Sequence, residues 1–186
     1  MGDNIDRMEY YTIASTGNGT DAGNLSSAYN SMSYTNGDSR YIVHGGYGDS
    51  GAIQLAEYND FSTSANASSF GYISSASTTG SAACASSRCV LHVPGNNENR
   101  LEYTNPAAAT GGWISTDFGN LTNPRSNSTA TSDGTTGEWY GGNDNVGGGH
   151  FSINYIDKIT IASASDSTDI GDLLESNRAP GSTSGT

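Results

Sequence analysis

Apolar and polar residues alternate with a period of two along several short segments of the chain. Tyr41 and Val43 alternate with their neighbours in 40–44, and isoleucine and tyrosine alternate with polar residues in 153–161. Successive side chains of a strand point to opposite faces of a sheet, so these segments predict short β-strands. Residues that form tight turns stand between such segments, at 16–19, 36–38, 110–112 and 132–134. The pattern predicts an all-β protein without long helices.

Three sequence landmarks recur along the chain. The first is an acidic residue followed by tyrosine, at Glu9-Tyr10, Glu57-Tyr58 and Glu102-Tyr103, with Asn154-Tyr155 as a drifted fourth copy. The second is a glycine between apolar residues, at Gly23, Gly71, Gly119 and Gly171. The third is a short strand that ends in a glycine pair or its Pro-Gly counterpart, at 40–46, 88–95 and 138–142. These landmarks share one spacing, so we infer an internal repeat of about 48 residues.

The order of these landmarks resembles the kelch repeat: a strand ending in Gly-Gly, a variable loop, a Glu-Tyr strand, and a strand near Phe-Gly-x-Leu. An arginine often follows, here Arg125 or Arg178, and the usual tryptophan before the last strand is replaced by Phe70, Phe118 or Ile170. This variant is similar to the kelch-like repeats of marine bacteriophage virion proteins of the tail-fibre type, through the segments 11–18 and 160–173. The resemblance implies β-propeller blades and a virion structural protein.

The repeat predicts a single kelch-like domain over residues 1–186, with four repeats at approximately 1–46, 47–95, 96–142 and 143–186. The last repeat is incomplete, because the chain has four strands of each of the first two kinds and three glycine-pair strands. The missing strand leaves an exposed sheet edge, which favours association. We therefore expect either a longer polypeptide or an assembly in which a partner subunit supplies that strand.

Composition restricts the partners. Leu, Ile, Val and Phe total 26 of 186 residues and the net charge is −12, which by itself is typical of disorder. The 25 glycines and 11 tyrosines instead suit closely spaced strands with aromatic cores. Nineteen carboxylates against seven basic residues disfavour nucleic acid, and no apolar run is long enough for membrane insertion. A well-hydrated acidic surface favours a virion or extracellular location.

The candidate chemistry is sparse. His44 and His92 occupy the same position of successive repeats and His150 lies in a glycine-rich loop, so we expect no metal site. No nucleophile elbow, phosphate loop or carboxylate pair has a signature, and we expect neither a catalytic residue nor a cofactor. Cys84 and Cys89 flank a turn, where both a local disulfide and two free thiols fit the sequence.

The loops after the glycine pairs are the remaining candidates for a binding site. They carry hydrogen-bonding and stacking side chains that suit carbohydrate: Tyr47, Asp49, Asn96, Glu98, Asn143 and Asp144. We therefore expect a non-enzymatic virion structural protein, a module of a tail fibre or capsid-associated appendage. Its expected partners are other virion subunits or copies of itself, with host surface glycans as candidate ligands. The alternatives are a secreted bacterial carbohydrate-binding or scaffold protein and, less favoured, a propeller enzyme.

Overall fold

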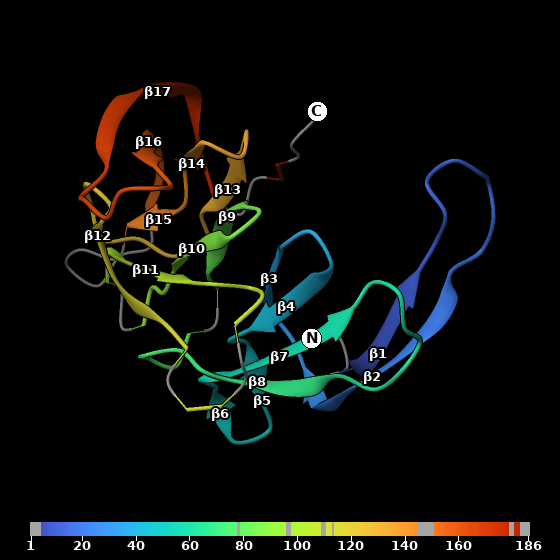
Figure 1. Ribbon diagram of the computed structural model, residues 1–186. Coiled ribbons are helices and arrows are strands. Elements are labelled where there is room, and N and C mark those ends of the chain that lie inside the picture. Colours follow the sequence, from blue (N-terminus) through green and yellow to red (C-terminus); the bar gives the residue numbers. More distant parts are fainter. Residues whose placement is uncertain are drawn as a thin grey trace.

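The computed structural model describes residues 5–77, 79–95, 98–108, 111–112, 114–144, 151–178 and 181–182. These residues form seventeen β-strands and no helix (Figure 1), so the all-β prediction is confirmed. Accordingly, no helix in the described part of the chain could cross a membrane.

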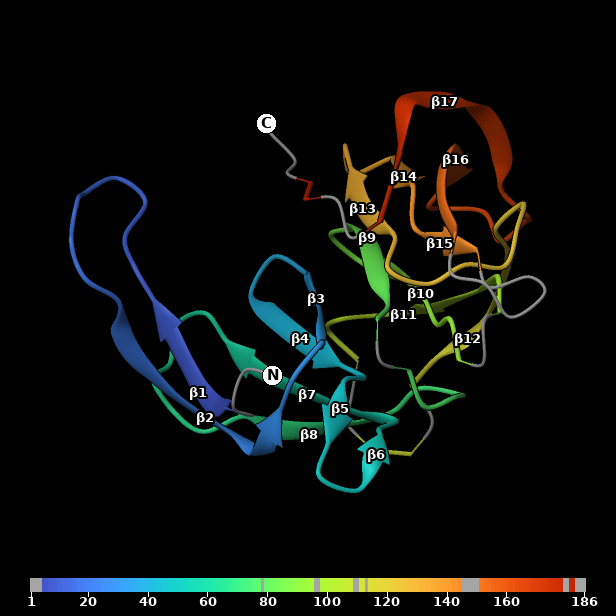
Figure 2. The ribbon, with the colours of Figure 1, turned by 180° about the vertical axis from the view of Figure 1, so that it is seen from behind.

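Two strands at the start of the chain form a sheet of their own, which we call the half-sheet. It contains β1 (Ile5–Tyr10) and β2 (Thr20–Tyr29), paired antiparallel. The long loop between them projects from the molecule in both views (Figures 1 and 2).

Three larger sheets follow, two of four strands and one of five, and all pairs are antiparallel. In each sheet four main strands pair in chain order, and the third sheet has a very short fifth strand. Sheet 1 contains β3 (Ser33–Asn36), β4 (Arg40–His44), β7 (Leu55–Asp60) and β8 (Ser68–Tyr72). Sheet 2 contains β9 (Ser81–Ala85), β10 (Arg88–His92), β11 (Arg100–Thr104) and β12 (Thr116–Asn120). Sheet 3 contains β13 (Thr129–Ser132), β14 (Thr136–Tyr140), β16 (Phe151–Thr160) and β17 (Thr168–Asn177).

Three very short strands lie in the loops that follow the glycine pairs. They are β5 (Tyr47–Gly48), β6 (Gly51–Ala52) and β15 (Asn143–Asp144). The half-sheet corresponds to the third and fourth strands of a four-stranded sheet. Each complete sheet therefore takes its first two strands from one sequence repeat and its last two from the next.

A glycine in the fourth strand marks the same irregularity in every sheet. Gly23, Gly71, Gly119 and Gly171 all have positive φ, between 110° and 147°, and each lies opposite a β-bulge. Such φ values are costly for residues with a Cβ, which explains why this landmark is the most regular of the three.

The bulges also correct the fourth acidic landmark. Gly171 pairs with Ile156, so the residue equivalent to Glu9, Glu57 and Glu102 is Asp157. The assignment to Asn154-Tyr155 was wrong by three residues. A lysine, Lys158, stands where the other repeats have tyrosine. β16 is longer than the third strands of the other sheets, because its first two residues pair with β15.

Neighbouring sheets pack face to face through their apolar side chains. Between sheets 1 and 2 the core contains Ile42, Phe70, Ile73 and Leu91, and between sheets 2 and 3 it contains Val90, Leu101, Phe118, Leu121, Trp139, Ile159 and Ile161. The first strands of the three sheets, β3, β9 and β13, lie side by side. We call the face turned toward the following sheet the forward face and the opposite one the rear face.

Candidate functional site

The structure gives two of the predicted loop residues a backbone role. Tyr47 and Asn143 are equivalent positions directly after the glycine pairs. Each forms an antiparallel bridge to the segment before the first strand of its sheet, Tyr47 to Asn30 and Asn143 to Ser126. The side chain of Asn143 is buried, whereas that of Tyr47 is half exposed. In sheets 1 and 3, the bridges therefore join the segment before the first strand to the loop that follows the second strand.

The other predicted loop residues are dispersed. Asp49 is exposed in the turn between β5 and β6, and Asp144 of β15 pairs with Phe151 of β16. The carboxylate of Glu98 lies 3.2 Å from Arg100 Nη2, while Asn96 lies outside the described residues. The β5–β6 hairpin and β15 are far apart in both views (Figures 1 and 2), so these loops do not form one binding surface.

His44 and His92 are both buried in their own sheets. His92 Nδ1 lies 3.1 Å from Ser128 Oγ, and its Nε2 lies 3.3 Å from the carbonyl oxygen of Glu98. Burial lowers the pKa of His44 to about 4 and that of His92 to about 3, where the nearby Arg125 charge adds to the effect. Both imidazoles are therefore neutral at pH 7. In the described part of the chain, no three His, Cys, Asp or Glu residues are grouped as a metal site.

The structure joins Cys84 and Cys89 in a disulfide. They face each other across β9 and β10, with Cα atoms 4.1 Å apart. Of the two states that the sequence left open, the structure has the disulfide.

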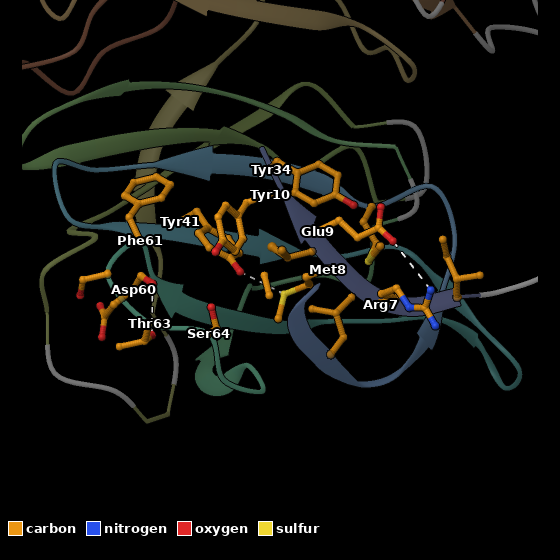
Figure 3. A pocket seen from close by; sticks show the side chains of 16 residues that line it. Arg7, Met8, Glu9, Tyr10, Tyr34, Tyr41, Asp60, Phe61, Thr63 and Ser64 are labelled. Carbon is orange, nitrogen blue, oxygen red and sulfur yellow. Dashed lines mark hydrogen bonds and ion pairs between the residues drawn. The ribbon is translucent and has the colours of Figure 1, made fainter. Parts of the chain in front are cut away.

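A groove lies between the half-sheet and sheet 1 (Figure 3). Its volume is about 510 Å³, and Met8, Leu25 and Val43 are among the apolar residues that line it. Aromatic side chains surround these apolar residues, and two carboxylates lie at the rim of the groove. These lining residues are Tyr10, Tyr34, Tyr41 and Phe61, with Glu9 and Asp60.

The groove follows the edge of β1 that has no strand partner among the described residues. In sheets 1 to 3 the corresponding third strand is paired on both edges. Tyr41 spans the groove and donates a hydrogen bond from its hydroxyl to Met8 Sδ, 3.2 Å away. Burial raises the pKa of the Tyr41 phenol, which remains a hydrogen-bond donor at neutral pH.

Sequence reasoning missed this groove. The aromatic residues around the edge come from separate strands and loops, and no spacing rule connects them.

A second recurring arrangement joins each sheet to the one before it, through the acidic residue of the third strand. Its carboxylate accepts a hydrogen bond from the backbone N–H three residues after the bulge glycine of the preceding sheet. The three pairs are Glu57 with Ser26 (3.0 Å), Glu102 with Ser74 (3.4 Å) and Asp157 with Thr122 (3.3 Å). We call this contact the carboxylate lock.

The loop between the third and fourth strands makes a further contact with the preceding sheet, which we call the loop lock. Asn66 Oδ1 accepts from Asn24 N (3.1 Å), and Asp166 Oδ1 accepts from Asn120 N (2.9 Å). Between sheets 1 and 2 the carbonyl oxygen of Gly112 takes this place and accepts from Tyr72 N at 2.9 Å. The residue that donates is always the one after the bulge glycine.

The closest approach in these locks requires glycine. A Cβ on Gly23 would lie 2.2 Å from the carbonyl oxygen of Ala65, and one on Gly119 would lie 2.4 Å from that of Ser165. Backbone meets backbone at these points, so no side-chain movement can relieve the overlap.

An ion pair is buried between sheets 2 and 3. Arg125 Nη2 contacts Asp157 Oδ2, and neither side chain is exposed to solvent. Burial lowers the pKa of Arg125, and the charge of Asp157 opposes that change. Asp157 therefore serves both this ion pair and the carboxylate lock.

Comparison with known proteins adds no family assignment. No protein-family model matches the chain, and no curated protein matches it at a significant level.

Proposed function

We propose that the chain is a kelch-like β-propeller module and a non-enzymatic structural part of a virion appendage, such as a tail fibre or a capsid-associated appendage. The observation that carries this proposal is the repeated unit itself. The half-sheet and three successive antiparallel sheets are joined by equivalent locks, and the first strands of the three sheets lie side by side. Such sheets are typical of propeller blades arranged around an axis.

The same observations favour a structural role. His44, His92 and Arg125 are buried, and two of them make contacts between successive repeats, His92 with Ser128 and Arg125 with Asp157. The disulfide and the acidic surface suit a virion or extracellular location.

The location can be tested on particles. Antibodies against the purified chain are used for immunogold electron microscopy of purified virions from the source, with culture medium and cell extract probed in parallel. We expect the label on an appendage of the particle. Label confined to the medium would overturn the virion role and favour a secreted scaffold.

The groove beside β1 favours carbohydrate binding as a second function. Tyr34 is 62% exposed and Phe61 is 58% exposed, with Asp60 next to Phe61. Aromatic faces combined with carboxylate acceptors match the alternating apolar and hydroxyl surfaces of sugars.

A glycan array with the intact chain tests this second function. Tyr34→Ala and Phe61→Ala should reduce binding, whereas Phe151→Ala, which removes an aromatic ring that is 66% exposed outside the groove, should not. Equal binding by all four proteins, or no binding by the unmodified chain, would exclude the groove as a glycan site. Release of a shortened glycan would indicate an enzyme instead.

A further inference from the structure

The rear face of the half-sheet carries the residues of both locks, and the described residues include no sheet that packs against this face. Glu9 is the equivalent of Glu57, Glu102 and Asp157, but it is exposed, and its carboxylate lies 3.8 Å from Arg7 Nη1. The same arginine–glutamate pair occurs in sheet 2, where Arg100 lies 3.7 Å from Glu102 and donates to Ser74 Oγ of sheet 1 at 2.9 Å. Arg7 and Glu9 thus repeat a pair that binds a preceding sheet elsewhere in the chain.

The loop between β1 and β2 repeats the second lock. Residues 12–15 form the same turn as residues 160–163, closed by Ser15 N to Thr12 O (3.2 Å) and by Ser163 N to Thr160 O (3.1 Å). In this alignment Asn18 corresponds to Asp166, which binds the preceding sheet. Ile13 corresponds to Ile161, yet Ile13 is 95% exposed and Ile161 is 1% exposed.

The opposite end of the molecule carries the complementary surface. β17 has the bulge glycine, Gly171, with φ 137°, but a Cβ there would meet nothing within 4 Å among the described residues. Asp172 and Leu174 stand where Asn24 and Ser26 donate their backbone N–H groups to the locks. Ile170 is 48% exposed, whereas its equivalents Phe70 and Phe118 are 0% and 2% exposed.

We propose that a second copy of this chain docks head to tail, with the rear face of its half-sheet on the forward face of β17. The carboxylate of Glu9 accepts from the N–H of Leu174, Asn18 Oδ1 accepts from the N–H of Asp172, and Ile13 covers Ile170. This inference rests on the proposed role as a repeat module and names its partner.

A second copy fits better than closure of one chain on itself. The half-sheet and β17 lie at opposite ends of the molecule in both views (Figures 1 and 2). Joining them within one chain would require the packed contacts between the intervening sheets to change. Docking between copies extends the existing series of contacts and leaves those within each chain intact. A contact between two different surfaces of this kind continues from copy to copy.

Cross-linking between two single variants tests the proposed pairing. Asn18→Cys and Asp172→Cys proteins are mixed under mild oxidation and separated without reducing agent. We expect a covalent dimer in the mixture that neither protein forms alone, because the equivalent positions Asn66 and Asn24 are in hydrogen-bond contact. The pair Asp38→Cys and Asp172→Cys serves as the control, since Asp38 is exposed in a turn of sheet 1.

Two outcomes of this experiment would overturn the proposal. One is the absence of a dimer above the level of the control pair. The other concerns a chain that carries both Asn18→Cys and Asp172→Cys. If this chain is oxidised quantitatively and remains monomeric, its two new cysteines are linked within one molecule. That result would show that the ends meet within one chain.

Sedimentation velocity measures the energetic part of the proposal. Glu9→Lys and Gly171→Ala should each raise the dissociation constant of the assembly by at least about tenfold, because one loses a charged acceptor and the other places a methyl group against the docked loop. Asp38→Lys changes the charge by the same amount as Glu9→Lys and should leave the constant unchanged. Thermal unfolding of each variant confirms that the monomer is folded.

The failures of the two proposals are distinguishable. If the chain stays monomeric at every concentration while antibodies label virions, the head-to-tail contact is wrong and the virion role stands. If the chain assembles through Glu9 and Gly171 but no particle carries it, the contact stands and the virion role is wrong.

Discussion

Removing one partner of the buried Arg125–Asp157 pair should strongly destabilise the protein. Both side chains have no solvent exposure, and Asp157 also accepts from Thr122 N (3.3 Å) and Thr122 Oγ1 (2.7 Å). Arg125→Met keeps the approximate volume of the side chain but leaves the Asp157 carboxylate buried without its counter-charge. Loss of one member of a buried pair costs about 3–5 kcal/mol. For a chain of this length, that corresponds to a fall in Tm of about 6–20 °C.

The measurement is urea unfolding followed by far-ultraviolet circular dichroism and by tryptophan fluorescence. Trp139, one of the two tryptophans, is buried in the same core between sheets 2 and 3, so the fluorescence of proteins that also carry Trp113→Phe reports on this contact. Coincidence of the two transitions establishes two-state unfolding. Arg178→Met is the matched control, because Arg178 is the other arginine that follows a bulge glycine and it is exposed. We expect a change below about 0.5 kcal/mol for that variant.

A double-mutant cycle separates the ion pair from the packing. Asp157→Asn retains an oxygen that can accept from Thr122 but leaves Arg125 unpaired. Combined with Arg125→Met, it should cost less than the sum of the two single variants, because the second substitution removes the charge that the first left unpaired. Additive losses, or an Arg125→Met variant as stable as the unmodified chain, would refute a buried pair between sheets 2 and 3.

Three further predictions concern other parts of the repeat. Gly119→Ala should cost at least about 2 kcal/mol more than Gly171→Ala in the monomer, because the two glycines have φ values of 144° and 137° but only the first meets a backbone atom; equal losses in urea unfolding would contradict the locks. The free energy of unfolding should fall as the pH is lowered from about 6.5 to 4, because histidines bind protons in the unfolded chain but His44 and His92 stay neutral in the folded one. In unfolding experiments at a series of pH values, His92→Asn should reduce this dependence on pH. Reduction of the Cys84–Cys89 disulfide should lower the stability by about 2 kcal/mol, measured as a shift of the urea midpoint with and without reductant.

Much of the fold followed from backbone requirements that leave a trace in the sequence. The bulge glycines must adopt positive φ. Wherever another sheet follows, a Cβ added to the glycine would lie 2.2–2.6 Å from a backbone oxygen of that sheet. Substitution of these glycines is therefore costly, which explains their regular spacing. The glycine pairs, with φ of 64° and 109° at Gly45 and Gly46, carry similar information. These positions predicted the repeat and the all-β class.

The side-chain landmarks were less informative, because chemistry can be conserved while the residue changes. The acidic function of the fourth repeat is supplied by Asp157, which is followed by lysine rather than tyrosine, whereas Asn154-Tyr155 resembles the Glu-Tyr pattern without being its equivalent. The loop residues Tyr47 and Asn143 look like ligands in the sequence, yet their equivalence within the repeat places them in separate sheets. Proximity between repeats depends on how sheets stack, which spacing along the chain does not encode.

The end of the molecule at β17 differs from the interior faces in a way that bears on how tightly copies would associate. In sheets 1 and 2, Arg40 and Arg88 stack on Tyr58 and Tyr103 and donate to backbone carbonyl oxygens of the following sheet. Sheet 3 has Thr136 and Lys158 at these positions, and Glu138, paired with Lys158 at 3.5 Å, replaces the buried Ile42 and Val90.

The forward face of sheet 3 therefore keeps the lock positions on its fourth strand, at Gly171 and its neighbours. It lacks the apolar contact that the second strand makes with the following sheet in sheets 1 and 2. The half-sheet has the matching deficiency, since its described residues form only the two outer strands, β1 and β2. Two surfaces that share the outer locks but bury little apolar area should associate more weakly than adjacent sheets within the chain. Sheets of one chain would then remain joined under conditions where copies separate, which gives a module that assembles reversibly without unfolding.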